Sequence, residues 1–506
     1  MLASPDANPT VPLTLILGLG ETGLAAARWC QYNGDRLRLA DTRSAPPQLA
    51  AARAVLAPHT EYHLGLTAFA PALLDGVNRV VLSPGLAPHD PALAPLLAAA
   101  AARALPVVGE IELFAQALVR LAAERQIAPQ VLAVTGTNGK TTVTALTTHL
   151  LQAAGWRARA AGNIGPAALQ ALLDALEQDD LPDVWVLELS SFQLESVTSL
   201  APQAAVVLNL TEDHLDWHGS MAAYGAAKAR VLQLAELAIV NRDDPQVRRM
   251  VPQLDARQVR SFGADAPTWA GDLGIDQSTG LAWLAEASSE AFGAEPPARR
   301  RKGEPEPGRS EGRLNRLMPA DALLLRGAHN HLNAQAAFLL ARSLGVAWPE
   351  LLRAVREYRG EPHRVSWVRS IDDIDFVDDS KGTNVGATLA ALQGLGRRVV
   401  LIAGGDGKGQ DFAPLAPAVA RHARAVVLIG RDADRLAAAL ADTGVPCLTL
   451  DSLPAAVAKA AELAKPGDTV LLSPACASLD MFRSYVERAQ VFVDAVEALA
   501  IERGAC

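Results

Sequence analysis

The residues most clearly suited to chemistry form a glycine-rich segment, Gly136-Thr-Asn-Gly-Lys-Thr-Thr142, which directly follows a short apolar run. Gly136 and Gly139 would allow backbone N–H groups to close around phosphate oxygens, and the start of a following helix would add a favourable dipole. Lys140 could then reach the terminal phosphates of a nucleotide, and the Thr141 hydroxyl could hold Mg²⁺. The loop is shorter than the usual GxxxxGKT spacing, because a valine stands where that pattern has its first glycine. The segment predicts a nucleotide-phosphate site.

Acidic residues that could hold a metal ion follow further along the chain. Glu188 comes after the apolar run 184–187, and a carboxylate at such a strand end is costly to bury unless it is paired or bound to a cation. Residues 208–218 read LNLTEDHLDWH, with His214 and His218 four positions apart. Two histidines could indicate zinc, but the oxygen-rich surroundings and the lack of an evident third nitrogen or sulfur ligand favour Mg²⁺. A polar surface turn remains the alternative for this segment.

Two other features, taken alone, predict roles that involve neither the phosphate loop nor a metal ion. Lys228 lies in a helical stretch with small neighbours, 224–231, where a lysine usually faces solvent. Gly18-Leu-Gly-Glu-Thr-Gly23 is a complete GxGxxG after an apolar run, and Asp41 ends the next run, about where a ribose-binding acid belongs. That pair predicts an NAD site. Against NAD, this first block of sequence ends near Val108, which is short for two complete mononucleotide-binding halves.

These residues lie at the ends of short apolar runs that alternate with Ala- and Leu-rich helical stretches, a pattern typical of parallel sheets covered by helices. The predicted strands are 11–17, 36–40, 79–82, 131–134, 184–189, 204–208, 398–403, 425–429 and 469–472. We therefore predict an α/β protein in three blocks, 1–108, 109–360 and 361–506. Within the second block, residues 295–313 contain Ala298 as the only apolar residue apart from Pro and Gly, so we expect a mobile loop there.

The composition narrows the class of protein. The chain has 506 residues, of which 50% are hydrophobic and 20% charged, as expected for about three globular domains. A net charge of -9 argues against a general nucleic-acid binder. Four scattered cysteines without a CxxC pair argue against a disulfide framework and a structural zinc site. No basic residue precedes Arg28, and the apolar stretch 93–108 is interrupted by Pro and Arg, so we expect a cytoplasmic protein with no secretory signal and no membrane span.

Taken together, the motifs resemble those of the Mur ligases, the ATP-dependent ligases of peptidoglycan synthesis. GTNGKTT, LELSSFQLE, NLTEDHLD and GAHNHLNAQAA (327–337) occur in the family's order. DDSKGTN (378–384), GGDGKG (404–409) and LLSPACASLDMF (471–482) are similar to the branch that adds D-glutamate to UDP-N-acetylmuramoyl-L-alanine, and the Asp-Asn-Pro-Arg signature of the diaminopimelate- or lysine-adding branch is absent. The resemblance implies a Rossmann-like N-terminal domain, a central P-loop ATPase-like domain with a parallel sheet, and a Rossmann-like α/β C-terminal domain.

The resemblance also implies roles for individual residues. Lys140, Asn163, His214 and Lys228 would be the catalytic group, with Asn163 contacting the acceptor carboxylate or the transferred phosphate. Thr141 and Glu188 would hold one Mg²⁺, and His214 a second. Lys228 would be carbamylated by CO₂, which requires a buried, neutral amine, and the carbamate would bear on that second ion. The residues implied to bind ATP are Gly136, Thr137, Asn138, Gly139, Lys140, Thr141, Thr142, His329, Asn330, Asn333, Arg364 and Asp379.

The two other substrates are assigned in the same way. The GxGxxG region would hold the uridine diphosphate portion of the acceptor instead of NAD, through Gly20, Thr22, Asp41, Thr42, Arg43, Ser83 and Gly85, with Asn163 from the second block. D-Glutamate would contact Thr383, Lys408, Ser478, Leu479 and Tyr485. A phenylalanine is usual in the position of Tyr485, so that contact gains a hydroxyl. The 295–313 segment has no counterpart in the family and receives no role.

The implied reaction has two steps. The acceptor carboxylate attacks the γ-phosphate of ATP to form an acyl phosphate, and the D-glutamate amine then displaces phosphate to form an amide. Arg364, Lys381 and Lys408 of the third block would close onto the ATP site and exclude water. The alternatives are folylpolyglutamate synthase, a related ligase whose pterin substrate does not suit a uridine-binding first block, and an NAD-dependent oxidoreductase, which would leave the phosphate loop and the metal residues without a role. We expect a monomer that binds no nucleic acid.

Overall fold

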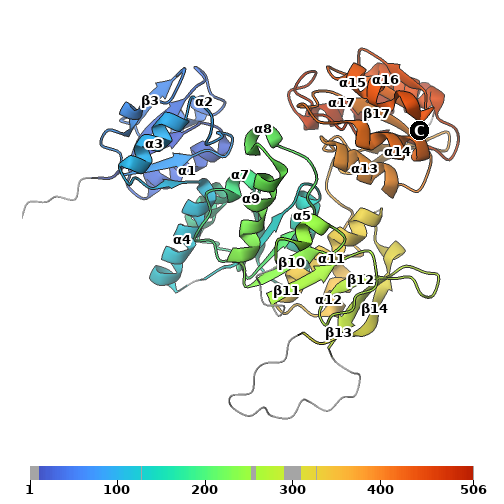
Figure 1. The fold of residues 1–506 in the computed structure, drawn as a ribbon, viewed down its shortest axis with the longest axis horizontal. Coiled ribbons are helices and arrows are strands. Elements are labelled where there is room, and N and C mark those ends of the chain that lie inside the picture. Colours follow the sequence, from blue (N-terminus) through green and yellow to red (C-terminus); the bar gives the residue numbers. More distant parts are fainter. Residues whose placement is uncertain (1–10, 127, 252–257, 290–308, 326, 505–506) are drawn as a thin grey trace, which may run out of the picture.

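The computed structural model describes residues 11–126, 128–251, 258–289, 309–325 and 327–504. The chain forms three lobes, blue at the N-terminus, green to yellow in the middle and orange to red at the C-terminus (Figure 1). The first lobe contains a five-stranded parallel sheet in the Rossmann-like order β3-β2-β1-β4-β5. Its elements are β1 (Leu13–Leu17), α1 (Glu21–Tyr32), β2 (Arg36–Asp41), α2 (Leu49–Val55), β3 (Glu61–Leu64), β4 (Arg79–Leu82), α3 (Ala94–Ala102) and β5 (Val107–Val108).

The middle lobe is built on a six-stranded parallel sheet in the order β11-β10-β9-β6-β8-β7. Its strands are β6 (Gln130–Thr135), β7 (Ala158–Gly162), β8 (Val184–Glu188), β9 (Ala204–Val207), β10 (Leu237–Asn241) and β11 (Val259–Phe262). Its helices are α4 (Glu110–Arg125), α5 (Lys140–Ala153), α6 (Ala168–Glu177), α7 (Ser191–Leu194), α8 (Leu215–His218), α9 (Met221–Leu234), α10 (Pro245–Arg248), α11 (Ala328–Ser343) and α12 (Trp348–Ala354). Because β6 lies between β8 and β9, the segments that follow these three strands meet at one edge of the sheet.

The middle lobe also holds a small antiparallel sheet that the sequence pattern does not predict. It has the order β12-β13-β14, with β12 (Leu273–Asp276), β13 (Trp283–Ser288) and β14 (Arg313–Pro319). The predicted mobile loop 295–313 falls partly on this sheet. Residues 295–308 lie outside the described residues, so the expectation of a mobile loop stays a prediction; at its end, Glu311 forms a β-bridge with Trp269, and Gly312 N–H donates to the Thr268 carbonyl.

The third lobe contains a six-stranded sheet in the order β15-β16-β20-β17-β18-β19, in which only the edge pair β15–β16 is antiparallel. Its strands are β15 (Ser366–Ile371), β16 (Ile374–Asp378), β17 (Val399–Gly404), β18 (Ala423–Ile429), β19 (Cys447–Thr449) and β20 (Thr469–Leu472). Its helices are α13 (Val385–Gly394), α14 (Ala416–His422), α15 (Ala433–Leu440), α16 (Leu453–Leu463) and α17 (Tyr485–Glu502).

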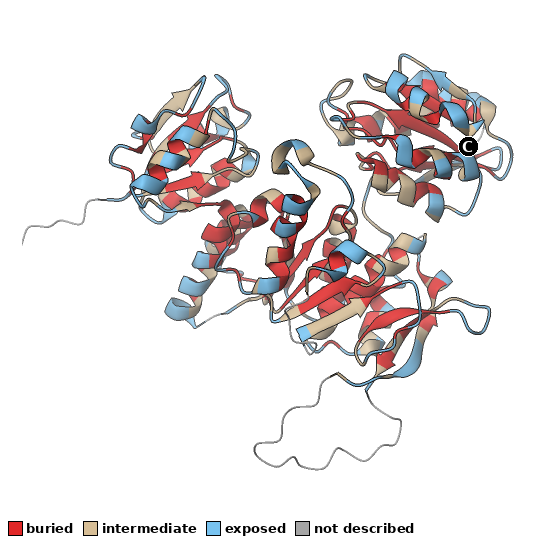
Figure 2. Cartoon of the chain, in the orientation of Figure 1, coloured by how far each residue is buried: buried red, intermediate tan, exposed pale blue. Residues whose placement is uncertain are grey.

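The lobes are joined in two different ways. A single buried apolar cluster runs from the first lobe into the second, including Ile16 and Trp29 with Phe114 and Trp185. The two buried clusters of the third lobe contain, among the described residues, no side chain from the first two lobes. Figure 2 shows buried segments on both sides of the gap between the second and third lobes, with exposed and intermediate residues at their rims. The third lobe is therefore a separately packed unit.

The predicted fold class is confirmed, and all nine predicted strands are present within one or two residues of their predicted limits. The described cysteines Cys30, Cys447 and Cys476 are free thiols, consistent with the expected lack of a disulfide framework. None of the helices in the described ranges combines the length and the apolar character that crossing a bilayer would need.

Candidate functional site

The phosphate-loop segment connects β6 to α5. Gly136 and Gly139 have φ angles of 151° and 85°, which side chains rarely adopt. A Cβ on Gly139 would also lie 2.7 Å from the side-chain oxygen of Asn333, so the close approach of α11 requires a glycine there. Lys140 Nζ folds back over the loop and donates hydrogen bonds to the carbonyl oxygens of Gly136 (2.9 Å) and Thr137 (2.8 Å). The turn, the lysine and the helix start predicted from the sequence are thus all in place.

Glu188 ends β8, next to the phosphate loop, and is almost fully buried. Its Oε1 accepts a hydrogen bond from Asn163 Nδ2 (2.8 Å), while its buried Oε2 has no hydrogen-bond partner in the described part of the chain. A carboxylate oxygen in that position is costly to bury unless a cation faces it. The described residues hold no group of three or more His, Cys, Asp and Glu side chains that could bind a metal alone. An ion beside Glu188 would therefore complete its shell with hydroxyl, phosphate and water oxygens, as Mg²⁺ usually does at nucleotide sites.

The predicted histidine pair does not converge on one point. His214 has a φ of 54°, and its Nε2 lies 3.6 Å from Asp213 Oδ2. The His218 Nε2 instead hydrogen-bonds the Ser191 hydroxyl (2.9 Å). The ring of Phe192 packs against both, with its centre 4.7 Å from that of the His214 ring and 5.5 Å from that of the His218 ring. Burial lowers the pKa of His214, and lowers that of His218 to about 4, so both rings are neutral at pH 7. Neutral imidazole can bind a metal, but this arrangement gives no support to zinc.

Lys228 is buried, contrary to what its helical surroundings alone predict. Only 1% of its surface is exposed, and its Nζ donates to the carbonyl oxygen of Gly136 (2.9 Å). The ammonium also lies 4.6 Å from the centre of the Tyr224 ring, whose hydroxyl is hydrogen-bonded to Thr137. Burial, reinforced by the nearby charge of Lys140, holds the pKa of Lys228 well below its usual value. The helix α9 thus places an amine that loses its proton easily directly beneath the phosphate loop.

Two cations from the third lobe reach the phosphate loop. Arg364 Nη2 donates a hydrogen bond to the Thr141 hydroxyl (2.7 Å), and Lys381 Nζ donates to the same oxygen (3.2 Å). Burial, together with the neighbouring charge of Arg364, lowers the pKa of Lys381 to about 8. These contacts place positive charge from the third lobe beside the hydroxyl that the sequence predicts to bind Mg²⁺.

The other residues predicted to bind ATP lie around this junction. Asn333 Nδ2 donates to Asn330 Oδ1 (2.9 Å), so both amides lie together on α11, next to Gly139. The half-buried His329 has a buried ring nitrogen, Nδ1, without a hydrogen-bond partner in the described structure, and desolvation lowers the pKa of His329 to about 4. Asp379 is bonded within the third lobe, to the Ser473 hydroxyl (2.7 Å) and the Val365 N–H (3.3 Å). Asp379 therefore fixes the segment that carries Arg364.

The residues predicted to bind D-glutamate lie after neighbouring strands of the third sheet. Thr383 follows β16, Lys408 follows β17, Ser478 and Leu479 follow β20, and Tyr485 is the first residue of α17. Because β16, β20 and β17 are adjacent and parallel, these segments share one edge of the sheet. Ser478 is buried, whereas Leu479 is 71% exposed. The Tyr485 ring lies 5.4 Å from Lys381 Nζ, which links this edge to the phosphate-loop junction.

Seven of the eight residues predicted to bind the uridine diphosphate portion line one cavity of about 320 Å³ in the first lobe, and only Asn163 does not: Gly20, Thr22, Asp41, Thr42, Arg43, Ser83 and Gly85. A second cavity of about 260 Å³ is lined by Asn163, Ser190 and Phe192 of the middle lobe. Thr22 and Pro84 line both cavities. The two hollows therefore adjoin, and together they lead from the first lobe to the residue that hydrogen-bonds Glu188.

Asp41 organises the first of these cavities. The buried carboxylate accepts hydrogen bonds from the backbone N–H of Leu19 (2.7 Å) and from Arg43 Nε (2.9 Å) and Nη2 (2.8 Å). Burial acts to raise the pKa of Asp41, but these hydrogen bonds outweigh it and hold the pKa below its usual value. Both carboxylate oxygens therefore hold the glycine loop and the Arg43 side chain in place. In an NAD site the corresponding acid would instead accept a hydrogen bond from the ribose hydroxyl.

The chain is similar to known proteins along its whole length. The chain matches three family models: Mur ligase MurD-like, N-terminal domain, over residues 13–109; Mur ligase middle domain, over 134–292; and Mur ligase, glutamate ligase domain, over 363–476. It is 61% identical to UDP-N-acetylmuramoylalanine--D-glutamate ligase of Bordetella parapertussis, over 100% of this chain and 99% of that protein. A protein of the same name from Burkholderia pseudomallei is 56% identical over 97% of this chain and 98% of that protein.

A solved structure shares the overall fold. UDP-N-acetylmuramate-alanine ligase MurC from Thermotoga maritima has a TM-score of 0.54 and 19% identity, and the match covers 96% of this chain and 99% of that one. The phosphate loop, the largely parallel sheet in each of the three lobes and these matches define the class as a three-domain ATP-dependent ligase. With full-length relatives at 61% identity, the chain belongs to the Mur ligase family.

One residue at the junction has no role in the sequence-based assignment. Asn384 ends the DDSKGTN motif, and its Nδ2 donates to Asn138 Oδ1 (3.1 Å) and Asp213 Oδ2 (3.3 Å) across the gap between the lobes. The available signal was an asparagine directly before a helical stretch, which indicates an N-cap. That signal identifies the local role of Asn384 but not its partners in another domain.

Proposed function

We propose that this chain is an ATP-dependent ligase that adds D-glutamate to UDP-N-acetylmuramoyl-L-alanine, a step in peptidoglycan precursor synthesis. The proposal rests on one observation. The cavity lined by Asn163 and the cations of the third lobe both lie next to the phosphate loop. Arg364 and Lys381 contact Thr141, while Asn163 lies between the second cavity and Glu188. The names of the relatives at 61% and 56% identity support the choice of substrates.

In this proposal each domain brings one reactant. Residues 1–108 bind the uridine diphosphate portion of the acceptor, residues 109–360 bind ATP, and residues 361–506 bind D-glutamate. The acceptor then extends from the cavity around Thr22 toward Asn163, so that its alanyl carboxylate arrives beside the phosphate loop. Holding reactants in this way supplies a large share of catalysis in phosphoryl transfer, because orientation alone contributes about 7–11 kcal/mol.

In the first step the acceptor carboxylate attacks the γ-phosphate and releases ADP. Asn163 orients the carboxylate, and Lys140 offsets the repulsion between the carboxylate and the triphosphate. Thr141 and the unpaired oxygen of Glu188 would hold one Mg²⁺, and His214 with a carbamylated Lys228 would hold a second. Bound Mg²⁺ would supply charge neutralisation at the phosphate oxygens.

In the second step the D-glutamate amine attacks the acyl phosphate carbonyl and phosphate leaves, giving the amide. The residues proposed to hold D-glutamate, among them Lys408 and Tyr485, lie on the sheet edge that faces the junction through Lys381. Because an acyl phosphate is hydrolysed by water, the third domain must cover the junction while the amine attacks.

Lys228 is proposed to act as a carbamate. A lysine adds CO₂ only through its neutral amine, and the burial of Lys228 favours that form. The modification turns a cation beneath the phosphate loop into an anionic oxygen ligand. It would also remove the repulsion between Lys228 and Lys140.

The two alternative functions account for less of the structure. A folylpolyglutamate synthase would not need the first-lobe cavity, and the match of residues 13–109 to a MurD-like N-terminal domain argues against it. An NAD-dependent oxidoreductase would require Asp41 to bind a ribose, but Asp41 is engaged by Leu19 and Arg43.

The test is phosphate release and amide formation, measured with each substrate omitted in turn. We expect one phosphate per amide when ATP, Mg²⁺, UDP-N-acetylmuramoyl-L-alanine and D-glutamate are all present, and no amide when any one is left out. Thermal-shift assays with ATP and Mg²⁺, with the acceptor and with NAD separate the alternatives. Stabilisation by NAD alone, or no amide from the complete mixture, would overturn the assignment.

A further inference from the structure

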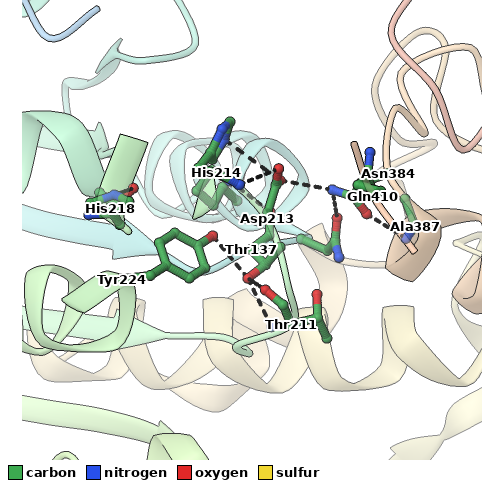
Figure 3. A network of polar contacts seen from close by, with 12 residues as sticks. Thr137, Thr211, Asp213, His214, His218, Tyr224, Asn384, Ala387 and Gln410 are labelled. Carbon is green, nitrogen blue, oxygen red and sulfur yellow. Dashed lines mark hydrogen bonds and ion pairs between the residues drawn. The ribbon is translucent and has the colours of Figure 1, made fainter. Parts of the chain in front are cut away.

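Asn384 connects the third domain to two loops of the second (Figure 3). It is the N-cap of α13, where its Oδ1 accepts a hydrogen bond from the Ala387 N–H (2.9 Å). Its Nδ2 donates to Asn138 Oδ1 of the phosphate loop (3.1 Å) and to Asp213 Oδ2, beside His214 (3.3 Å). Both N–H groups of this buried amide are therefore used across the domain boundary, and its oxygen is used within its own domain.

The neighbouring glycine shows how closely the two domains approach. A Cβ on Gly386 would lie 2.9 Å from Asn138 Nδ2 and 3.0 Å from Thr211 Oγ1. Real Cβ atoms rarely approach polar atoms that closely, so an alanine here would force the Asn138 and Thr211 side chains, or the start of α13, to shift. Gly386 has no hydrogen-bonding side chain, so replacing it by alanine adds a methyl group at the boundary without removing a side-chain hydrogen bond.

On the third-domain side, the start of α13 is tied to the loop that carries Lys408. The Val385 N–H donates to Gln410 Oε1 (3.1 Å), and Gln410 Nε2 donates to the Gly407 carbonyl (3.1 Å). Gly407 directly precedes Lys408, one of the residues proposed to bind D-glutamate. A single polar chain thus extends from that loop through α13 to Asn138 and Asp213.

On the second-domain side, the chain continues to His214. Asp213 Oδ1 accepts the His214 backbone N–H (3.0 Å), and Asp213 Oδ2 lies 3.6 Å from the His214 ring nitrogen. The contacts of Arg364 and Lys381 with Thr141 differ in kind, because those cations are the groups that a nucleotide phosphate would attract. The Asn384 contacts join protein side chains only, so they need no phosphate to form.

We propose that Asn384 is a positioning residue that sets the closed orientation of the third domain over the phosphate loop and the Asp213–His214 loop. This inference rests on the proposed function. Asn384 touches no reacting atom and acts through Asn138 and Asp213. When the third domain is closed, the D-glutamate amine attacks the acyl phosphate carbonyl, phosphate leaves and the amide forms. When it is open, water attacks the same carbonyl, so the free acid returns and ATP is spent without an amide.

The variants separate the interdomain role from helix capping. Asn384→Ser keeps a side-chain oxygen that caps a helix as well as asparagine does, but it removes the Nδ2 donor. Asn384→Ala removes both. Gly386→Ala removes no donor but crowds Asn138 and Thr211 at the domain boundary, and we expect it to disturb the closed contact. The measured quantity is phosphate released per amide formed, together with kcat and KM for D-glutamate.

We expect about one phosphate per amide in the wild type and at least three in Asn384→Ser, Asn384→Ala and Gly386→Ala, with kcat/KM for D-glutamate lower by about tenfold. Leu448→Ala, at an exposed site on β19, should match the wild type. If Asn384→Ser keeps the wild-type ratio while only Asn384→Ala is impaired, Asn384 is merely a helix cap and the proposal is wrong.

Small-angle X-ray scattering of the ligand-free proteins gives a readout that does not depend on turnover. Asn384→Ser and Gly386→Ala should increase the radius of gyration relative to the wild type and Leu448→Ala. An unchanged radius together with an unchanged phosphate-to-amide ratio would refute the proposal. If the wild type forms no amide at all, the proposed function fails, and scattering alone then decides whether Asn384 orients the third domain.

Discussion

The difference in the free energy of unfolding between Glu110→Gln and the wild type should shift in favour of the variant as the pH rises. Glu110 is the first residue of α4, the helix that leads from the first domain into the second, and only 2% of its surface is exposed. Its Oε1 accepts the Leu169 N–H (2.6 Å), while its buried Oε2 has no hydrogen-bond partner among the described residues. Burial raises the pKa of Glu110 to about 7, although the N–H groups of Leu169 and Ala168 oppose it.

The sign and size follow from proton linkage. The unfolded carboxyl loses its proton near pH 4.5, and the folded one keeps it until about pH 7. The contribution of Glu110 is therefore most favourable below pH 4.5 and is lost as pH rises through 7, so wild-type stability falls across this interval. A rise in pKa from 4.5 to about 7 corresponds to about 3 kcal/mol. Glutamine does not titrate, so the stability of Glu110→Gln relative to the wild type should improve by up to about 3 kcal/mol between pH 4.5 and 8.

Glu112, two residues further along α4, provides the matched control. Burial acts to raise its pKa, but hydrogen bonds from the backbone of Thr198 and Ser199, and from the Ser199 hydroxyl and Gln116, outweigh it and hold the pKa below the usual value. Its stabilisation is present above the unfolded pKa and is lost as pH falls through the lower folded pKa. Glu112→Gln should therefore destabilise the protein at pH 7, and by less as the pH falls.

Urea denaturation at pH 4.5, 5.5, 7 and 8, followed by tryptophan fluorescence, measures both trends. Trp185 packs edge-on against Phe114 of α4, with ring centres 5.6 Å apart, so its emission responds when this helix detaches. A stability difference between Glu110→Gln and wild type that stays constant over this range would show that Glu110 titrates normally, and would refute the reasoning.

Three further predictions concern the proposed reaction. Lys228→Ala should lose most ligase activity while circular dichroism stays unchanged, and an added short-chain acid should restore part of it; near-wild-type turnover would argue against the carbamate. Asp41→Asn should raise KM for the uridine substrate about tenfold, because Arg43 loses its charged two-point partner, and unchanged steady-state kinetics would contradict this. Tyr485→Phe should keep KM for D-glutamate within about threefold, because the ring that faces Lys381 remains, and a tenfold change would give the hydroxyl a role in binding.

Nine of the parallel strands could be predicted because they are short, largely apolar runs with turn residues close behind, whereas the sequence pattern does not predict others such as the half-buried β3. β17 and β20 are buried along their whole length, and their side chains carry that information directly. β14 could not be predicted in this way, because four of its seven residues are exposed and three of these are polar, which interrupts the apolar run. Its position depends on pairing with β13 across the segment 290–308, a long-range contact that local sequence does not specify. The polar composition of residues 295–313 also predicts a loop up to the residue at which β14 begins, Arg313.

The site shows the same division between local and distant causes. The phosphate loop is a local structure, because its glycines and its lysine act on one another within a few residues. The burial of Lys228 is decided by the packing of α9 beneath that loop, so the helical pattern alone favours the wrong environment. Asn384 is recognisable as a helix cap, but its contacts with Asn138 and Asp213 exist only once two domains meet.

The two domain boundaries differ in a way that suits the proposed reaction. One boundary holds the acceptor-binding domain in place, and the other lets the amino-acid-binding domain open and close. The first domain shares an apolar core with the second, and opening such a core would expose side chains such as Trp29 and Phe114 to water. The third domain meets the second through the polar contacts of Arg364, Lys381 and Asn384. Each of these exchanges for contacts with water at a net cost of about 0.5–1.5 kcal/mol, or about 1.5–3 kcal/mol where a charged group takes part. Under the proposed function, we therefore expect the third domain, and not the first, to open for ATP and amino acid and to close again over the acyl phosphate.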